Sequence, residues 1–479
     1  MSADNFRGGA VFAPMTMRRI LRTLLPLAAI AILSYAASPA SAATAISPAR
    51  GFAPRQLLAK LEGERHARAI ELAPGTGVRR AARALRRNPN VVYATPNYIA
   101  SASALPPSPY DPNDSGGLAA TSEAAAAPGS WVYKQWNFLG YDAARAAGMP
   151  TSPGGIDAPG AWRNLIEAGH PGGAGALVAV LDSGIAYRAL GTGFRRSPDF
   201  GPRQFVPGYD FVEGDRVPLD ESGHGTHVAG TIAEKTGNGV GVTGLAYRAK
   251  LMPVRVLDRN GFGNAFDIAR GIRFAVAHHA QVINMSFNFA CGKRVPTIDE
   301  ALREAYERGV VTVASAGNLG SETCVSEPAT GPRVIGVGGT TEGGCLGDYS
   351  LAGQAIDLVA PGGGVPQSGC PSVAARPIYQ VTLQPKSTKE FGIPANYVGT
   401  SMAAAHVSGV AAMVLASRRI DPLLSDEARV RAVTKRLRNT ARDLGLPRPQ
   451  QGAGLIDAEA ATGTGPSFYP PGQHPPLPE

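Results

Sequence analysis

The sequence predicts an α/β domain built on a mainly parallel sheet, and three segments carry that prediction. The apolar run ALVAVLD ends at Asp182 and is flanked by Gly175 and Gly184, as expected of a buried parallel strand. Two other segments have the composition of tightly packed helices. They are HGTHVAGTIAE, which begins at His224, and MAAAHVSGVAAMVLA, which follows Ser401.

The same segments hold the parts of a nucleophilic site in the chain order Asp182, His224, Ser401. A serine hydroxyl is a poor nucleophile at neutral pH, so acyl transfer needs an imidazole to take its proton and a carboxylate to orient that imidazole. An acid at the carboxyl end of a parallel strand lies where open α/β sheets place ligands. The hydroxyl and the backbone N–H of Ser401 would lie at a helix N-terminus, where partial positive charge favours a developing oxyanion.

Each of these residues also has an ordinary structural interpretation. An Asp at a strand end is more often a cap or a turn residue, and a Ser before a helix is usually an N-cap. His224 and His227 could ligate a metal, but no Glu follows the first of them and no third ligand cluster is evident. We therefore interpret His227 as a core histidine, and the joint order of the motifs favours catalysis.

The flanks of these residues resemble the subtilisin-like serine peptidases, or subtilases. The motifs VAVLDSGI, GHGTHVAG and GTSMAAAHVSG carry the resemblance, and further blocks from QWNF to GAGLIDAEAA follow in the family's order. The resemblance implies a three-layer α/β domain over residues 105–463, with Asp182, His224 and Ser401 as its triad. It assigns the side-chain amide of Asn318, in GVVTVASAGN, as the oxyanion donor. It implies a secreted serine endopeptidase that acts through an acyl-enzyme and needs no cofactor for the chemistry.

In this family the substrate is held as an extended strand between two segments of the enzyme. The resemblance places one edge at Ser286, Phe287 and Asn288. The other edge would run from Gly261 to Asn264, where Gly261 and Gly263 leave the backbone free to pair. A simple turn is the alternative interpretation of RNGFGN.

Two other functions stay open at this point. Phe287 and Phe289 are bulkier than the residues that many members carry there, which favours a narrow pocket and a protease that processes one partner. A catalytically silent binding module on the same fold is disfavoured because all four active residues are intact.

The first part of the chain has the features of export and maturation signals. Residues 1–42 have a basic start, an apolar centre and small residues at Ala40 and Ala42, which is typical of a secretory signal. The apolar stretch is too short for a membrane span. Residues 43–104 resemble the inhibitory propeptide of subtilases, and the alternation in VVYATPNY favours a folded unit over a linker. Residues 464–479 are Pro-rich and predict a disordered tail.

Charge excludes a nucleic-acid role for the catalytic part. The net charge of the chain is +9, but residues 1–42 hold four basic and one acidic residue and residues 43–104 hold ten and three, so about −1 remains after residue 104. The basic character belongs to the parts that maturation would remove. The expected partners are a polypeptide substrate and the chain's own propeptide, and we expect a monomer without a membrane span.

Four cysteines, an even number in a chain expected to be exported, predict two disulfides. Three pairings of these residues are open. The resemblance implies the pairs Cys291 with Cys324 and Cys345 with Cys370. No CxxC spacing supports zinc, and no metal site is assigned. The loop TGNGVG around Asn238 resembles a structural calcium site of the family, although it carries few carboxylates.

Overall fold

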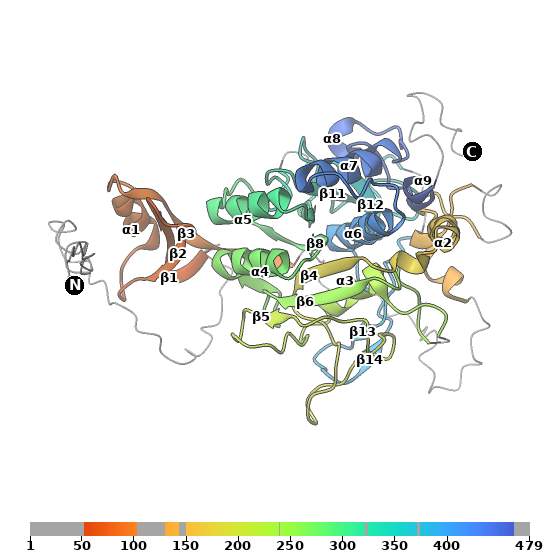
Figure 1. Ribbon diagram of the computed structural model, residues 1–479, viewed down its shortest axis with the longest axis horizontal. Coiled ribbons are helices and arrows are strands. Elements are labelled where there is room, and N and C mark those ends of the chain that lie inside the picture. The colour runs from red at the N-terminus through yellow and green to blue at the C-terminus, as the bar shows by residue number, and fades with distance from the viewer. Residues whose placement is uncertain are drawn as a thin grey trace, which may run out of the picture.

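A parallel sheet forms the centre of the computed structural model, which describes residues 52–102, 130–142, 150–238, 240–320, 324–370 and 374–463 (Figure 1). The expected signal, the segment 103–129 and the expected Pro-rich tail from 464 lie outside these residues. In the described part the sheet has seven strands, in the order β12 (Leu358–Pro361), β11 (Ile335–Thr340), β10 (Val311–Ser315), β8 (Val282–Met285), β4 (Leu177–Asp182), β6 (Lys250–Arg255) and β5 (Tyr209–Asp210). All neighbouring strands are parallel.

Strand β4 shows why the sheet is buried on both faces. Val178 and Val180 belong to one hydrophobic core, whereas Ala179 and Leu181 belong to the other. Successive side chains of a strand point to opposite faces, so an uninterrupted apolar run is what two covered faces require.

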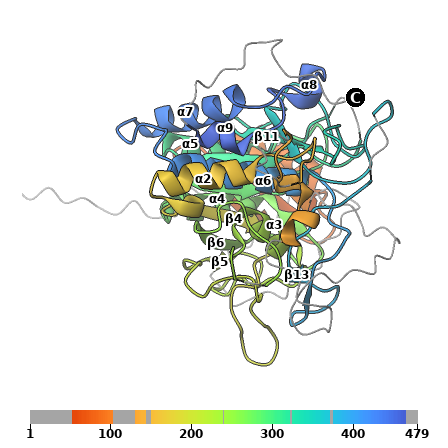
Figure 2. The same cartoon turned by 90° about the vertical axis from the view of Figure 1, so that its right-hand side faces the viewer.

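Helices cover both faces of the sheet and make three layers (Figures 1 and 2). The core on one face includes residues of α2 (Ala158–Glu167), α3 (His224–Ala233), α6 (Thr400–Ala416), α7 (Asp426–Asn439) and α9 (Ala458–Thr462). The core on the other face includes residues of α4 (Ala265–Ala277) and α5 (Pro296–Glu307). The predicted three-layer α/β architecture is therefore confirmed.

Helix α6 is buried along nearly its whole length. It is apolar on every side, and such a helix is stable only inside a large core. At Gly409 an added Cβ would lie 3.1 Å from side-chain atoms of Leu245, so the small residues here permit close packing.

Residues 52–102 form a small α+β unit at one end of the molecule (Figure 1). It consists of β1 (Phe52–Leu61), β2 (Arg68–Glu71), α1 (Val78–Leu85) and β3 (Val91–Ala102), and its strands are antiparallel. A separate core that includes Leu57, Leu72 and Ala94 holds it together. The prediction of a folded unit rather than a linker agrees with this arrangement.

The small unit rests on α4 and α5 through polar contacts. The ammonium of Lys60 lies 3.1 Å from a carboxylate oxygen of Glu300, and the Tyr93 hydroxyl donates to the other oxygen of the same carboxylate at 3.1 Å. The side chain of Asn97 accepts a hydrogen bond from the backbone N–H of Phe266, in the first turn of α4. These contacts fix the direction in which β3 leaves the unit.

Both disulfides have the pairing that the resemblance implied, Cys291 with Cys324 and Cys345 with Cys370. Each closes a loop of the large domain. Across the described ranges, no helix combines the length and the apolar character that crossing a membrane demands.

Candidate active site

The expected acid and base meet at the carboxyl edge of the sheet. Strand β4 ends at Asp182 and α3 begins at His224, so the strand end and the helix start face each other. Nδ1–H of His224 donates to Oδ1 of Asp182 at 2.7 Å, and both side chains are buried. This bond fixes the imidazole tautomer and leaves Nε2 as the nitrogen that can accept a proton.

The pKa of His224 is raised above its usual value by the balance of opposing effects. Burial alone would lower this pKa, but the charge of Asp182, the hydrogen bond to it and the charge of Asp220 outweigh burial. The imidazolium that forms when His224 takes a proton is therefore stabilised.

Asp220 is a second buried carboxylate behind the imidazole, and it was not among the residues expected from the sequence. Its Oδ1 accepts from the Ser183 hydroxyl at 2.9 Å and from the backbone N–H groups of Ser222 and Gly223. Its Oδ2 accepts from the N–H and the hydroxyl of Thr226. Asp220 thus ties the chain after β4 to the first turn of α3. Its position four residues before His224 in DESGHG was the available signal.

The expected nucleophile lies in the first turn of α6. Ser401 Oγ donates to the backbone carbonyl of Ser286 at 3.1 Å, and the Ser286 hydroxyl donates to the Ser401 carbonyl at 2.9 Å. Among the described residues, Nε2 of His224 is buried without a hydrogen-bond partner. The Ser401 hydroxyl is therefore held at Ser286, which belongs to one expected substrate edge. Nε2 of His224 stays available to accept a proton.

The amide of Asn318 is oriented from the start of the same helix. Its Oδ1 accepts from both the N–H and the hydroxyl of Thr400 at 2.9 Å, and the Thr400 hydroxyl in turn accepts from the N–H of Gly317 at 3.1 Å. Because the oxygen faces Thr400, the NH2 group of Asn318 is the end that faces away. Thr400 was not singled out from the sequence, although a hydroxyl residue at a helix start is a common orienting group.

Residues 173–455 match the subtilase family. The chain belongs to this family. That segment contains the seven strands of the sheet and every residue of the site described above, and members of the family are serine endopeptidases. They need no cofactor for catalysis.

Subtilases from several bacteria are similar to this chain. A thermophilic serine proteinase of Bacillus sp. (strain AK1) is 33% identical over 337 residues, which are 70% of this chain and 66% of that protein. Subtilisin Savinase of Lederbergia lenta is 34% identical over 66% of this chain and 100% of that protein. The crystal structure of fervidolysin from Fervidobacterium pennivorans is 25% identical with a TM-score of 0.61, and the match covers 87% of this chain and 61% of that structure.

The two expected substrate edges lie on either side of β3. The end of β3 pairs antiparallel with β7 (Phe262–Asn264) through Ala100 and Gly263, and with β9 (Phe287–Phe289) through Ala102 and Phe287. Gly263 is required by the packing of β7 against its own domain, because a Cβ there would lie 2.2 Å from the carbonyl oxygen of Val256. Gly261, just before β7, has a φ of 77° and forms the turn that the alternative interpretation of RNGFGN required.

The aromatic residues of β9 do not face the cleft. The side chains of Phe287 and Phe289 are 0% and 2% exposed and belong to the core under α4 and α5. The expectation that their bulk narrows the substrate pocket is therefore wrong, because strand alternation alone does not say which face of the strand the core occupies. Asn288, between them, donates to the carbonyl of Ser315 at 2.6 Å.

His227 is a core histidine and not a metal ligand in this arrangement. Its Nε2 bonds the carbonyl of Ile378 at 3.0 Å, its ring stacks on Tyr397 at 4.0 Å, and burial lowers its pKa to about 3. The imidazole is neutral at physiological pH and takes no part in proton transfer.

Asp220→Asn is expected to change the dependence of kcat/KM on pH. The rise of kcat/KM on the acidic side, called here the acid limb, should move to lower pH. His224 must be neutral to accept a proton, so activity rises with pH through its raised pKa, and removing one of the charges that raise this pKa moves the rise downward. Because the new NH2 group would face an N–H of Thr226, we also expect a loss of about 1–3 kcal/mol in stability.

Thr226→Val is the matched control for that change, measured by the same pH profile and by denaturant unfolding. It removes the hydroxyl that donates to Asp220 but keeps the charge. It should destabilise the fold and leave the acid limb in place. An equal displacement of the limb in both variants would contradict a role for the Asp220 charge.

Thr400→Val is expected to lower kcat by roughly tenfold with little change in KM. The loss of one orienting hydrogen bond of about 1–1.5 kcal/mol lets the Asn318 amide turn, which matters mainly in the transition state. Thr400→Ser keeps the hydroxyl and should restore kcat. Steady-state kinetics on a short chromogenic peptide measure both, and a KM effect without a kcat effect would contradict the assignment.

Proposed function

We propose that Asp182, His224, Ser401 and Asn318 carry the endopeptidase reaction of this subtilase. The observation that carries the proposal is the 2.7 Å bond between buried His224 and Asp182. Further support comes from α6, which packs against α3 and carries Ser401 in its first turn. The Ser401 hydroxyl turns from the Ser286 carbonyl to Nε2 of His224, as loosely formed catalytic hydrogen bonds do when substrate binds. Ser401 then attacks the peptide carbonyl carbon while His224 takes its proton.

The rest of the reaction follows from the same groups. The NH2 group of Asn318 and the N–H of Ser401 hold the oxyanion, and His224 returns the proton to the leaving amine. An acyl-enzyme forms at Ser401 Oγ, and water hydrolyses it with His224 again as the base. Asp182 keeps the imidazole oriented and stabilises the imidazolium that forms.

A fluorophosphonate probe tests this assignment directly. The processed wild-type enzyme should acquire one label, and mass spectrometry should place it on the peptide that contains Ser401. His224→Ala should label far more slowly, and Ser401→Ala should not label. A label on another serine, or none, would overturn the assignment.

We further propose that residues 43–104 are an inhibitory propeptide of an exported zymogen. The support is the pairing of β3 with both β7 and β9, which is strand addition at the expected substrate site. Ala102 pairs with Phe287, the neighbour of Ser286, so the first peptide bonds that can reach Ser401 come just after Ala102. N-terminal sequencing of the mature enzyme should therefore find a start between Ser103 and Pro106.

Export is supported by the two disulfides and by a relative. Disulfides persist in oxidising compartments. The 35% identical relative from Xanthomonas campestris, of which the chain covers 54%, is named an extracellular protease. Broad proteolysis is favoured over the processing of one partner, because the side chains of Phe287 and Phe289 belong to the core and do not narrow the cleft.

We propose a structural calcium ion beside Asp199, Glu234 and Asn238. Glu234 Oε1 is buried without a hydrogen-bond partner, and burial raises the pKa of both carboxylates, that of Asp199 to about 7. Two buried carboxylates are oxygen donors of the kind that calcium takes. Asn238, in the loop after α3, donates its NH2 group to Asp199 Oδ1 at 2.6 Å and so holds that carboxylate in place. In the described ranges, no group of three or more His, Cys, Asp or Glu side chains is placed to hold a metal ion. Backbone oxygens would therefore have to complete the coordination shell of the calcium ion.

Chelation is therefore expected to destabilise the protein. At free calcium a hundredfold above its Kd, the ion would contribute about 2.7 kcal/mol, so adding EDTA should lower the melting temperature measured by calorimetry. Asp199→Asn should remove the response to EDTA, whereas Asp357→Asn, at a half-buried carboxylate elsewhere, should keep it. An equal response in wild type and Asp199→Asn would contradict this site.

A further inference from the structure

Two adjoining hollows open beside β5 and the C-terminal half of α4. They have volumes of about 390 and 760 Å³, and they share Pro207, Gly208 and Arg216. No residue of the proposed triad or of the substrate edges lines them. We call the two hollows together the arginine groove.

The arginine groove concentrates positive charge on a nearly neutral domain. Its larger hollow is lined by Arg188, Arg195, Arg196 and Arg216, and no acidic residue of the described chain lines either hollow. None of these four exposed guanidiniums forms an ion pair with a carboxylate of the described residues. Arg270, in the smaller hollow, differs because it pairs with Asp267 at 3.0 Å. The residues after 104 carry a net charge of about −1, so this local charge is not a general property of the surface.

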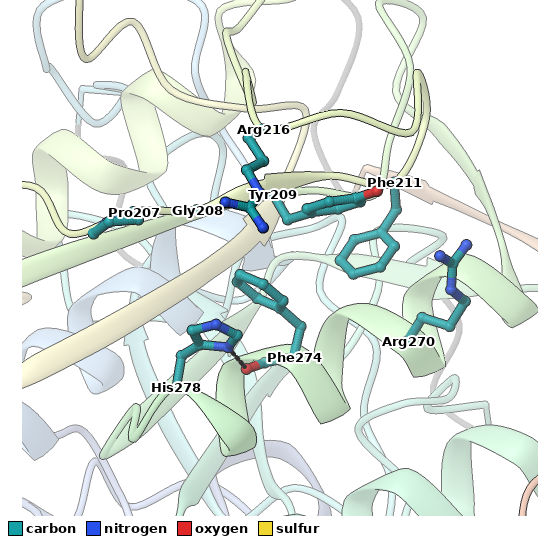
Figure 3. Close-up of a pocket in the computed structure, with 8 residues that line it drawn as sticks. All are labelled: Pro207, Gly208, Tyr209, Phe211, Arg216, Arg270, Phe274 and His278. Carbon is teal, nitrogen blue, oxygen red and sulfur yellow. Dashed lines mark hydrogen bonds between the residues drawn. The ribbon is translucent and has the colours of Figure 1, made fainter. Parts of the chain in front are cut away.

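Aromatic rings form the apolar part of the same groove. The rings of Tyr209 and Phe211 are 4.7 Å apart, and His278 stacks on Phe274 at 3.9 Å. Figure 3 shows Arg216 and Arg270 on two sides of this ring cluster. Arginine beside partly exposed aromatic rings is the composition of energetic centres in protein interfaces.

We propose that the arginine groove binds acidic segments of polypeptide substrates, outside the catalytic cleft. The inference rests on the proposed function, because a second contact on the same polypeptide raises the effective concentration of substrate at Ser401. Guanidiniums recognise carboxylates by paired, charge-assisted hydrogen bonds. The aromatic rings of the groove would contact the apolar side chains that lie between the acidic residues of the bound segment.

The charges around the groove favour a peptide over a uniformly charged polymer. Glu213 and Asp215 are exposed in the same loop as Arg216, although they do not line either hollow. A nucleic acid or polyuronate, with a charge on every unit, would meet these carboxylates. A polypeptide can place its acidic residues on the arginines and neutral ones elsewhere.

Direct binding is the first test, made on the full-length Ser401→Ala chain so that the probe is not digested. The probe is a short fluorescent peptide in which Glu and Leu alternate, and its counterpart has Gln in place of Glu. Fluorescence anisotropy should show tighter binding of the Glu peptide. Arg188→Gln/Arg195→Gln/Arg196→Gln should weaken this binding by roughly tenfold, as should raising the salt concentration.

The charge-matched control is Arg303→Gln/Arg308→Gln/Lys435→Gln, which removes three exposed cations that lie outside the groove. It should bind the Glu peptide as the parent does. Equal losses in both triple variants, or no preference for the Glu peptide, would overturn the proposal. Arginine-dependent binding of polyuronate with no binding of the Glu peptide would also overturn it and assign the groove to a glycan.

Kinetics with the active enzyme separate this proposal from the proposed function. A chromogenic peptide should be cleaved equally by wild type and both triple variants. The same peptide extended at either end by a Gly/Ser linker and a Glu/Leu segment should show a higher kcat/KM only when the groove arginines are present. If the short peptide is cleaved but the Glu/Leu segment does not raise kcat/KM, the groove does not bind acidic segments, and the assignment of the triad is unaffected. If neither peptide is cleaved, the proposed function is refuted.

Discussion

Ser401→Ala is expected to abolish peptidase activity and to leave the protein as a precursor. Without Oγ no acyl-enzyme can form, and loss of a triad nucleophile lowers turnover by about a million-fold. The fold should survive, because Oγ contributes to it through a hydrogen bond to the Ser286 carbonyl and the smaller Ala side chain fits the same space. The chain after Ala102 should then remain uncut, with the small unit still attached through β3.

Mass measurement and N-terminal sequencing of both proteins, made in a protease-deficient host, give the readout. The matched control is Ser408→Ala, which removes another buried hydroxyl of α6 that donates to Asn284 Oδ1 at 2.9 Å. That variant should mature and stay active. Normal trimming of the Ser401→Ala protein would show that another protease carries out maturation, even if activity is lost.

The elements around the triad could be predicted from the sequence because each has a strong local signal. The run that forms β4 is apolar at every position before Asp182, so both faces had to be covered. The composition of α6 is too apolar for a surface helix. Such patterns determine element type and layer, and they place Asp182, His224 and Ser401 at the ends of their elements.

The supporting residues could not be predicted in the same way. Thr400 acts through a hydrogen bond to Asn318, and Asp220 accepts one from Ser183, so each role depends on a residue that is distant in the chain. Which side chains of β9 point to the core depends on where the core lies, and the strand pattern does not give this. An extended segment was therefore expected correctly at Phe287, but its side chain was expected in the substrate pocket and lies in the core. The arginine groove brings together residues of a loop, a strand and a helix, which have no common period in the sequence.

Asn318→Ala is expected to lower kcat by about 100- to 1000-fold and to change KM little. The NH2 group donates to charge that exists only in the transition state, so its removal raises the barrier without weakening ground-state binding. Two bonds from Thr400 to Oδ1 hold the amide in this orientation. Steady-state kinetics on a short peptide and the rate of fluorophosphonate labelling should fall together.

Asn318→Asp separates the donor role from a structural one. It keeps an oxygen that accepts from Thr400 but replaces the donating NH2 group with a second acceptor, which would repel a developing oxyanion. Its kcat should therefore fall at least as far as that of Asn318→Ala, while its unfolding midpoint stays closer to that of the wild type. Two results would contradict the donor role: wild-type turnover in Asn318→Asp, or a raised KM with unchanged kcat in Asn318→Ala. In either case the amide would position substrate, and the N–H of Ser401 would have to hold the oxyanion without it.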